Sequence, residues 1–396
     1  MGASTRDAVA MSRAADRAEP GTRLLSLDVV RGITIAFMIM VNNNGGSGSW
    51  GFMNHAAWNG LTATDLVFPT FVFVMGASVV FAIESRLARG STRAQLVRHT
   101  LQRAAILCVL GVVVNSFPFF ELDHMRFYGV LQRIAVCYVA VSLLYLWNRR
   151  VWLIATTLAV VLIGYWVLLR WVPVPGAGVP GRDVPFMDVG QNVVSWLDRQ
   201  LFPYHLYREP PDHNLRDPEG LLSDLPAIGT ALMGMLAGIW LRTRRSIPAR
   251  TRGLAVAAIA SLALGYLWAP WFPLNKNMWT SSYVLVAGGY ALALVTFAFW
   301  AVEEKGWRTG WTWVWLVFGS NAIAAYMFSE LLPAVLWNVH FTAAGQRTDA
   351  ITFVLEHVFA RVPDPGWAAF AYSVSFTAVC FVPVWMLYRR RIFLKV

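Results

Sequence analysis

The chain has 396 residues, of which 57% are hydrophobic and only 14% are charged. A soluble domain carries about 25% charged residues, so this composition excludes both a soluble globular protein and a disordered one. The three cysteines, Cys108, Cys137 and Cys380, are far apart and match no disulfide or metal-binding spacing. The net charge is +11, but the basic residues lie between apolar segments, which indicates membrane topology and not nucleic-acid binding.

The order of polar and apolar segments along the chain predicts a short tail followed by an all-α polytopic membrane domain. Residues 1–20 are polar and lack an apolar core segment, so we expect a disordered cytoplasmic tail and not a cleaved signal peptide. Residues 21–396 form the expected transmembrane domain. Ten apolar segments follow, most of them long enough to cross a bilayer and two of them shorter, at roughly 24–44, 61–83, 100–117, 128–147, 151–171, 221–241, 253–270, 280–300, 311–338 and 367–388.

Basic residues predict the orientation of these spans. With the N-terminus inside, the inner segments hold 22 Lys and Arg and the outer loops hold 8, so both termini should be cytoplasmic. The long loop 172–220 is then outside and contains eight of the 19 prolines, which favours an ordered irregular cap or a flexible loop. Arginine outnumbers lysine by 30 to 3, as in GC-rich bacterial genomes, so we expect a bacterial inner-membrane protein and a periplasmic loop.

Charged residues inside spans are costly and are usually functional or paired. Asp28 and Arg31 are three residues apart in the first span and hence on one helical face. They predict either a structural ion pair or a site for a charged cofactor.

The densest polar cluster joins the first two spans at their outer ends. Asn42 ends the first span, and His55, Asn59 and Asp65 precede or begin the second. A histidine here is suited to accept a proton or to act as a nucleophile near neutral pH. Asp65 could orient His55 or could cap and anchor the helix. Because it follows His55 by ten residues, close to three helical turns, we favour a helix or cofactor-site anchor over a direct partner of His55.

Further candidates lie on later segments. Arg133 is inside the fourth span and needs a partner, either a bound phosphate or carboxylate or one of Asp65 and Asp28. Acidic residues before the sixth span suggest helix capping or a cationic substrate. The remaining candidates for cofactor binding are Arg126, Gln132, Arg390 and Lys395, and those for substrate binding are His205, Asp217, Glu219, Asn275 and Lys276.

Several strings of this sequence resemble the heparan-α-glucosaminide N-acetyltransferase family, which includes a lysosomal enzyme of animals and bacterial relatives. The strings are Ser26-Leu27-Asp28 with Arg31-Gly32, His55 with Trp58-Asn59-Gly60-Leu61-Thr62 and Asp65, Gly129-Val130-Leu131-Gln132-Arg133, Asp217-Pro218-Glu219-Gly220, Pro273-Leu274-Asn275-Lys276-Asn277-Met278-Trp279, and the terminal Ile392-Phe393 with Lys395. The resemblance runs from about residue 23 to the C-terminus.

The resemblance implies an acetyltransferase that takes acetyl-CoA on the cytoplasmic side and acetylates an amino sugar of the glucosamine type on the far side. His55 matches the family's catalytic histidine and Asn42 an asparagine near it. Asn42 or Asn59 is then expected to donate a hydrogen bond to the thioester oxygen. Whether His55 carries the acetyl group or acts as base stays open at this point. No metal is expected, and the expected partners are the sugar acceptor, the bilayer and a second copy of the chain in a homodimer.

A transporter of amino sugars such as N-acetylglucosamine is the alternative. Ten helices with polar residues at membrane depth and without a soluble catalytic domain suit such a protein. Acetyl transfer from acetyl-CoA to glucosamine distinguishes the two functions.

Overall fold

The computed structural model describes residues 24–46, 48–208, 215–343 and 345–394; the expected tail 1–20 and Lys395 lie outside them. The α-helices are α2 (Leu25–Asn42), α3 (Val67–Ala88), α4 (Arg93–Ser116), α5 (Val130–Trp147), α6 (Val151–Trp171), α7 (Val193–Leu201), α8 (Asp224–Leu241), α9 (Ile247–Trp268), α10 (Ser281–Phe299), α11 (Thr312–Ser320), α12 (Ala322–Asn338), α13 (Ala350–His357) and α14 (Pro365–Arg389). Short helical turns are η1 (Gly51–Met53), η2 (Thr64–Leu66), η3 (Leu122–His124), η4 (Leu221–Ser223), η5 (Trp300–Glu304) and η6 (Phe359–Arg361), and two strands, β1 (His340–Ala343) and β2 (Gln346–Asp349), pair antiparallel.

Among the described residues, nine helices are long and apolar enough to cross a membrane, and the α11–α12 pair adds a tenth, bent candidate. The predicted all-α membrane fold is therefore confirmed.

The predicted ninth span, 311–338, is wrong as a single helix, because α11 and α12 meet at an angle of 79°. The break lies at Asn321, whose φ of −131° and ψ of 45° are not helical. Its side chain instead holds the C-terminal segment: Nδ2 donates to the Ile392 carbonyl at 3.0 Å, and Oδ1 accepts from Leu394 N–H at 2.8 Å. An asparagine side chain that binds backbone groups favours such a helix end.

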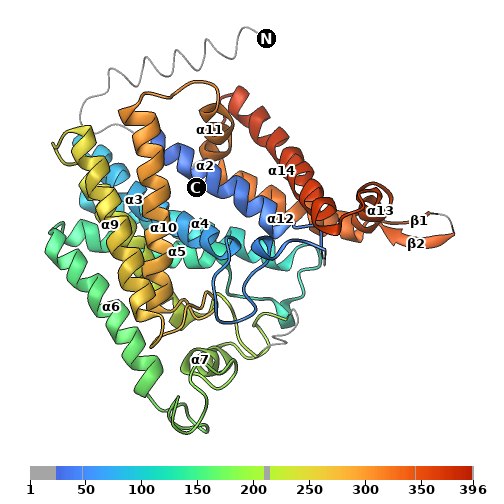
Figure 1. Ribbon diagram of the computed structural model, residues 1–396, viewed down its shortest axis with the longest axis horizontal. Coiled ribbons are helices and arrows are strands. Elements are labelled where there is room, and N and C mark those ends of the chain that lie inside the picture. The colour runs from blue at the N-terminus through green and yellow to red at the C-terminus, as the bar shows by residue number, and fades with distance from the viewer. Residues whose placement is uncertain (1–23, 47, 209–214, 344, 395–396) are drawn as a thin grey trace.

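The centre of the bundle consists of α2, α3, α8 and α10, whose residues are largely buried. Figure 1 shows α2, α3 and α10 in the middle, with α6, α9 and α14 toward the outside. Small residues allow α3 and α8 to lie close together: a Cβ atom at Gly76 would stand 2.0 Å from the Ala231 carbonyl oxygen, and one at Gly234 would stand 1.9 Å from that of Phe73. Such contacts bring helix backbones together in membranes.

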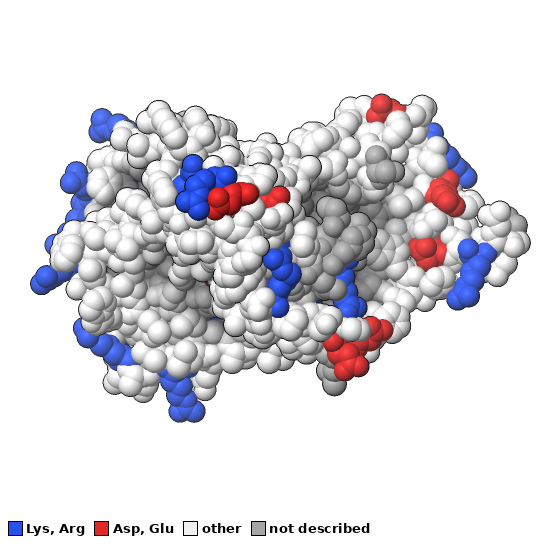
Figure 2. Space-filling model, turned by 90° about the horizontal axis from the view of Figure 1, so that it is seen from below, with Lys and Arg blue, Asp and Glu red and all other residues white. Residues whose placement is uncertain are grey.

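The connections at one end of the bundle carry most of the irregular chain. The described part of loop 172–220 is irregular except for the nine-residue helix α7, at the lower edge of Figure 1. The β1–β2 hairpin and α13 project to the right; these strands were not predicted, since each has four mostly exposed residues without apolar alternation. Seen from below, charged side chains form small scattered groups on a mostly uncharged surface (Figure 2).

Candidate active site

The loop between α2 and α3 turns back on itself and brings His55 to Asp65. His55 Nδ1 lies 2.7 Å from Asp65 Oδ1, and the Asp65 side chain is 1% exposed while that of His55 is 50% exposed. Asp65 Oδ2 accepts from the N–H groups of Ala56 (3.1 Å) and Thr62 (2.9 Å) and from Thr62 Oγ1 (3.0 Å). The interpretation of Asp65 as a remote anchor is therefore wrong, because the intervening residues are not helical.

This geometry selects one form of the imidazole. Asp65 is surrounded by hydrogen-bond donors, so its carboxylate acts as an acceptor. In the contact between the two side chains, His55 Nδ1 therefore carries the proton and donates it to Asp65. The tautomer leaves the lone pair on Nε2, the nitrogen that does not face Asp65. A half-exposed imidazole with a free Nε2 lone pair and a buried carboxylate behind it can accept a proton or form a bond to an acyl carbon.

The turn between α9 and α10 packs against the loop between α2 and α3. Asn275 is fully buried; its Nδ2 donates to Asn59 Oδ1 at 3.1 Å, and its Oδ1 accepts from Met278 N–H at 2.8 Å. The turn places Lys276 Nζ 3.0 Å from His55 Nε2 and 3.2 Å from Nδ1. Burial lowers the pKa of Lys276, while the carboxylates of Glu219 and Asp65 act in the opposite direction.

Loop 172–220 contacts the His55 loop through Trp58. Trp58 Nε1 donates to the Met187 carbonyl at 2.7 Å, and the Arg216 guanidinium lies 4.6 Å from the centroid of the Trp58 ring. Loop 172–220 therefore contacts the candidate site directly.

Buried ion pairs join the start of α5 and the residues just before it to the end of loop 172–220 and the start of α8. Arg126 donates to Asp217 at 2.8 and 2.6 Å and also bonds Glu219. Burial alone would lower the pKa of Arg126, but Asp217 and Glu219 outweigh that effect and raise it. The predicted cofactor residue Arg126 thus lies with two predicted substrate residues, and its guanidinium already binds them.

Arg133 pairs with a residue that the sequence analysis did not name. Its side chain is buried, its Nε donates to Asp224 Oδ1 at 2.8 Å, and its Nη2 bonds Ser223 and the Gly220 carbonyl (3.2 Å). The proposed pairing with Asp65 or Asp28 is wrong, because α8 begins beside α5 and presents Asp224 at its first residue.

Arg133→Met should destabilise the protein strongly, because Asp224 would remain buried without its cation. Breaking one side of a buried pair costs about 3–5 kcal/mol. Thermal unfolding in detergent measures this, and Arg133→Met with Asp224→Leu should recover much of the loss. A single variant that unfolds at the wild-type temperature would show that the pair is unimportant for stability.

Of three other predicted site residues, two contact protein groups through their side chains and one has no hydrogen-bond partner among the described residues. Asn42 Nδ2 donates to Glu330 Oε1 on α12 at 3.0 Å. His205 Nδ1 lies 2.8 Å from the Met125 carbonyl oxygen, and its ring packs on Phe127. The Gln132 amide is buried and finds no hydrogen-bond partner among the described residues.

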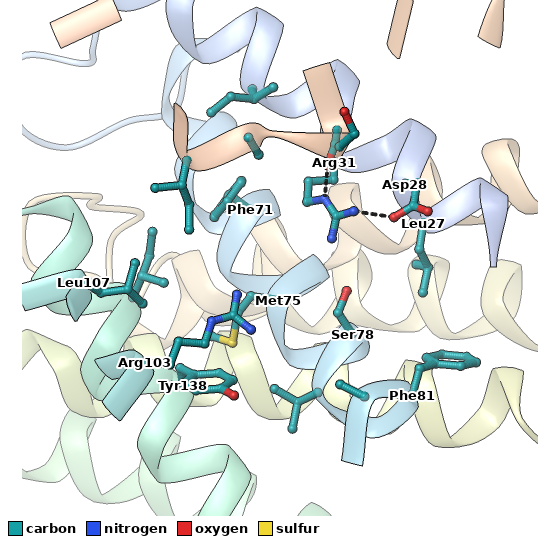
Figure 3. A pocket seen from close by; sticks show the side chains of 18 of the residues that line it. Leu27, Asp28, Arg31, Phe71, Met75, Ser78, Phe81, Arg103, Leu107 and Tyr138 are labelled. Atoms are coloured by element: carbon teal, nitrogen blue, oxygen red, sulfur yellow. Dashed lines mark hydrogen bonds and ion pairs between the residues drawn. The ribbon is translucent and has the colours of Figure 1, made fainter. Parts of the chain in front are cut away.

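A cavity of 610 Å³ extends between α2, α3, α4, α5 and the α11–α12 break. Asp28 and Arg31 line it and pair with each other, and Arg31 Nε donates to the Gly319 carbonyl at 2.8 Å. Figure 3 shows Arg31 and Arg103 pointing into this space from different helices. Along α3 and its end, the residues that line the cavity extend from Arg89 back to Phe71. Phe71 follows Asp65 by six residues, which corresponds to about 9 Å along a helix.

Three cavity arginines, Arg86, Arg89 and Arg103, were missed as candidates. Arg86 and Arg89 are three residues apart near the end of α3, a spacing that places both on one face and was a usable signal. Arg103 comes from α4, and its Nε is buried without a hydrogen-bond partner among the described residues. Of the predicted cofactor residues, Arg390 is exposed at the end of α14, whereas Phe393 and Leu394 line the cavity.

Residues 23–180 match the family model described as heparan-alpha-glucosaminide N-acetyltransferase, catalytic. The human heparan-alpha-glucosaminide N-acetyltransferase is 30% identical over 360 residues, covering 78% of this chain and 53% of the human protein. The mouse protein of the same name is 29% identical over 365 residues, covering 80% of this chain and 54% of its own length. The chain thus spans about half the length of these relatives. Over these residues the chain is similar to the heparan-alpha-glucosaminide N-acetyltransferase family.

Proposed function

We propose that this protein is a transmembrane acetyltransferase that moves the acetyl group of acetyl-CoA to an amino sugar of the glucosamine type. The observation that carries the proposal is the cavity, which is lined by arginines and extends along α3 as far as Phe71, six residues after Asp65, the partner of His55. Acetyl-CoA is too highly charged to cross a bilayer. If the cavity receives acetyl-CoA from one side and His55 takes the acetyl group beyond its far end, the acetyl group can reach the other side alone.

The residues present suit the charged end of acetyl-CoA. Guanidinium groups bind phosphates in bidentate geometry, and Arg86, Arg89 and Arg103 lie around one cavity. The unused Nε of Arg103 is a buried donor in need of an acceptor. Toward Phe71 the lining becomes apolar, which suits an uncharged pantetheine arm.

His55 would carry out the proton chemistry of the transfer. An amino sugar is mostly protonated at neutral pH and must lose a proton before its nitrogen attacks. The Nε2 lone pair can take that proton or bond to the acetyl carbon first, and in both cases the Asp65 carboxylate stabilises the positive imidazole. Asn42 or Asn59 would donate to the thioester oxygen; Asn42 must then leave Glu330, to which it is bonded here.

The decisive assay gives the purified protein labelled acetyl-CoA and a set of amino sugars. Label on the sugar, dependent on the protein, supports the proposal. Uptake of unmodified sugar into vesicles, without acetylation, would instead support the transporter.

Arg103→Gln should weaken acetyl-CoA binding without loss of the fold. A hydrogen bond to a charged group is worth roughly 1.5–3 kcal/mol, which corresponds to about 10- to 150-fold in affinity. Arg98→Gln is the matched control, since Arg98 is exposed on the same helix and does not line the cavity. Equal affinity in the two folded variants would place the phosphates elsewhere. Lys395 stays a predicted phosphate ligand outside the described residues.

We further propose cytoplasmic termini and a periplasmic loop 172–220 in a bacterial inner membrane, on the distribution of basic residues. Single cysteines in that loop should react with an impermeant reagent in sealed cells, whereas cysteines near residues 95 and 247 should not. Labelling at 95 or 247 would reverse the orientation, and with it the side from which acetyl-CoA enters.

A further inference from the structure

Lysine is rare in this chain, and one of the three lysines lies against the candidate catalytic histidine. Lys276 Nζ is 3.0 Å from His55 Nε2 and 3.2 Å from Nδ1. Among the described residues, no carboxylate oxygen lies within ion-pair distance of this Nζ. The other two lysines are Lys305, which is exposed after α10, and Lys395.

The paired distances place the amine over the face of the ring. Nδ1 and Nε2 flank the Cε1 carbon of the imidazole, and Asp65 occupies the in-plane direction of Nδ1. One atom nearly equidistant from both nitrogens, and so close to them, would collide with the carbon between them if it lay in the ring plane. Lys276 therefore leaves the in-plane lone pair of Nε2 free.

We propose that Lys276 is a self-acetylation site, which receives an acetyl group from acetyl-CoA by way of His55 when no sugar acceptor is present. This inference rests on the proposed function. In the overall reaction the bond between the acetyl carbon and the CoA sulfur breaks and a bond to Nζ forms. Nε2 first displaces CoA, which leaves as the thiolate and takes a proton from water to become the thiol. The neutral Nζ then attacks the acetyl carbon, the bond from that carbon to Nε2 breaks, and the proton lost by Nζ passes to Nε2. The product is N-acetyl-lysine and needs no other reactant.

The position of Nζ suits this reaction. An acetyl group on Nε2 is conjugated with the imidazole and lies in its plane, and a nucleophile approaches a carbonyl carbon from above that plane. An amine over the ring face is on this side of the carbon. The burial that lowers the pKa of Lys276 also favours its neutral, nucleophilic form.

The acetyl group would remain on Lys276. An amide is a poor acetyl donor, so N-acetyl-lysine is a stable product and not an intermediate on the way to the sugar. Acetylation also removes the positive charge beside His55, Asp65 and Glu219.

The test incubates the full chain in detergent with isotopically labelled acetyl-CoA, without an amino sugar, and maps acetyl-lysine by peptide mass spectrometry. Lys305 is an internal reference for chemical acetylation. We expect Lys276 to acquire label at least ~100-fold faster than Lys305. This ratio is only a small part of the rate advantage that a well-positioned nucleophile can have. His55→Ala should reduce labelling of Lys276 to the level of Lys305, and the matched variant His357→Ala should not. Acetyl-CoA binding by both variants checks their fold.

A parallel incubation with an amino sugar separates this inference from the proposed function. Acetylated sugar with an unlabelled Lys276 in both incubations would overturn the inference and leave the proposed function standing. Label on Lys276 that persists in folded His55→Ala would also overturn it, because the transfer would not pass through His55. If neither the sugar nor Lys276 is acetylated by a protein that binds acetyl-CoA, both proposals fail.

Discussion

We expect His55→Ala to abolish acetyl transfer while the protein remains folded and binds acetyl-CoA. The cavity arginines come from α2, from α3 and its end, and from α4, and the half-exposed His55 does not line the cavity, so the co-substrate site should survive. If His55 acts only as base, the rate should fall by roughly 10²–10⁴-fold. If His55 itself carries the acetyl group, the reaction should fall to background.

Radiolabel transfer to an amino sugar and acetyl-CoA binding are measured on the same preparation. His357→Ala is the control, since His357 is an exposed histidine on α13. Near-normal turnover by a folded His55→Ala protein would refute the role of His55 and remove the chemical reason for the proposed function.

Asp65→Asn should lower the turnover number with little effect on the KM for acetyl-CoA. Asparagine keeps the size of the side chain, but its Nδ2 can donate to His55 Nδ1. The imidazole would then carry its proton on Nε2 and lose the lone pair that faces the reaction. Reversal of a tautomer in this way costs about 10⁴-fold in a Ser-His-Asp triad, which indicates the scale of the expected effect.

Asp65 also accepts from Thr62, so a structural contribution must be measured separately. Thr62→Val removes the hydroxyl donor but keeps the backbone N–H, and Asp123→Asn is an exposed control outside the site. If Thr62→Val slows the reaction as much as Asp65→Asn does, Asp65 acts by shaping the loop and not by selecting the tautomer.

Much of the fold could be predicted because membrane spans leave a local signal. About twenty successive apolar residues predict a spanning helix whatever they contact later. The ninth span shows the limit of this signal: residues 311–338 are mostly apolar, yet the chain breaks at Asn321. That break depends on Ile392 and Leu394, about seventy residues further on, which bond the asparagine side chain.

The site was predictable as a set of residues and not as a geometry. His55, Asp65, Asn275 and Lys276 stood out because polar groups are rare in such a chain and occur in strings typical of a family. Their contacts did not follow from spacing. Asp65 looked distant from His55 under helical spacing, whereas the irregular loop joins them at 2.7 Å.

The sequence by itself thus determined the membrane class and nearly all of the spans, and it singled out His55 as the candidate catalytic histidine. These features follow from local composition and from motifs that can be read without a partner. Only the tertiary structure decided that Asp224 and not Asp65 pairs with Arg133, that Arg86, Arg89 and Arg103 share one cavity, and that Lys276 lies on His55. Each of these depends on two segments far apart in the chain, and a contact across helices is set by how the whole bundle packs.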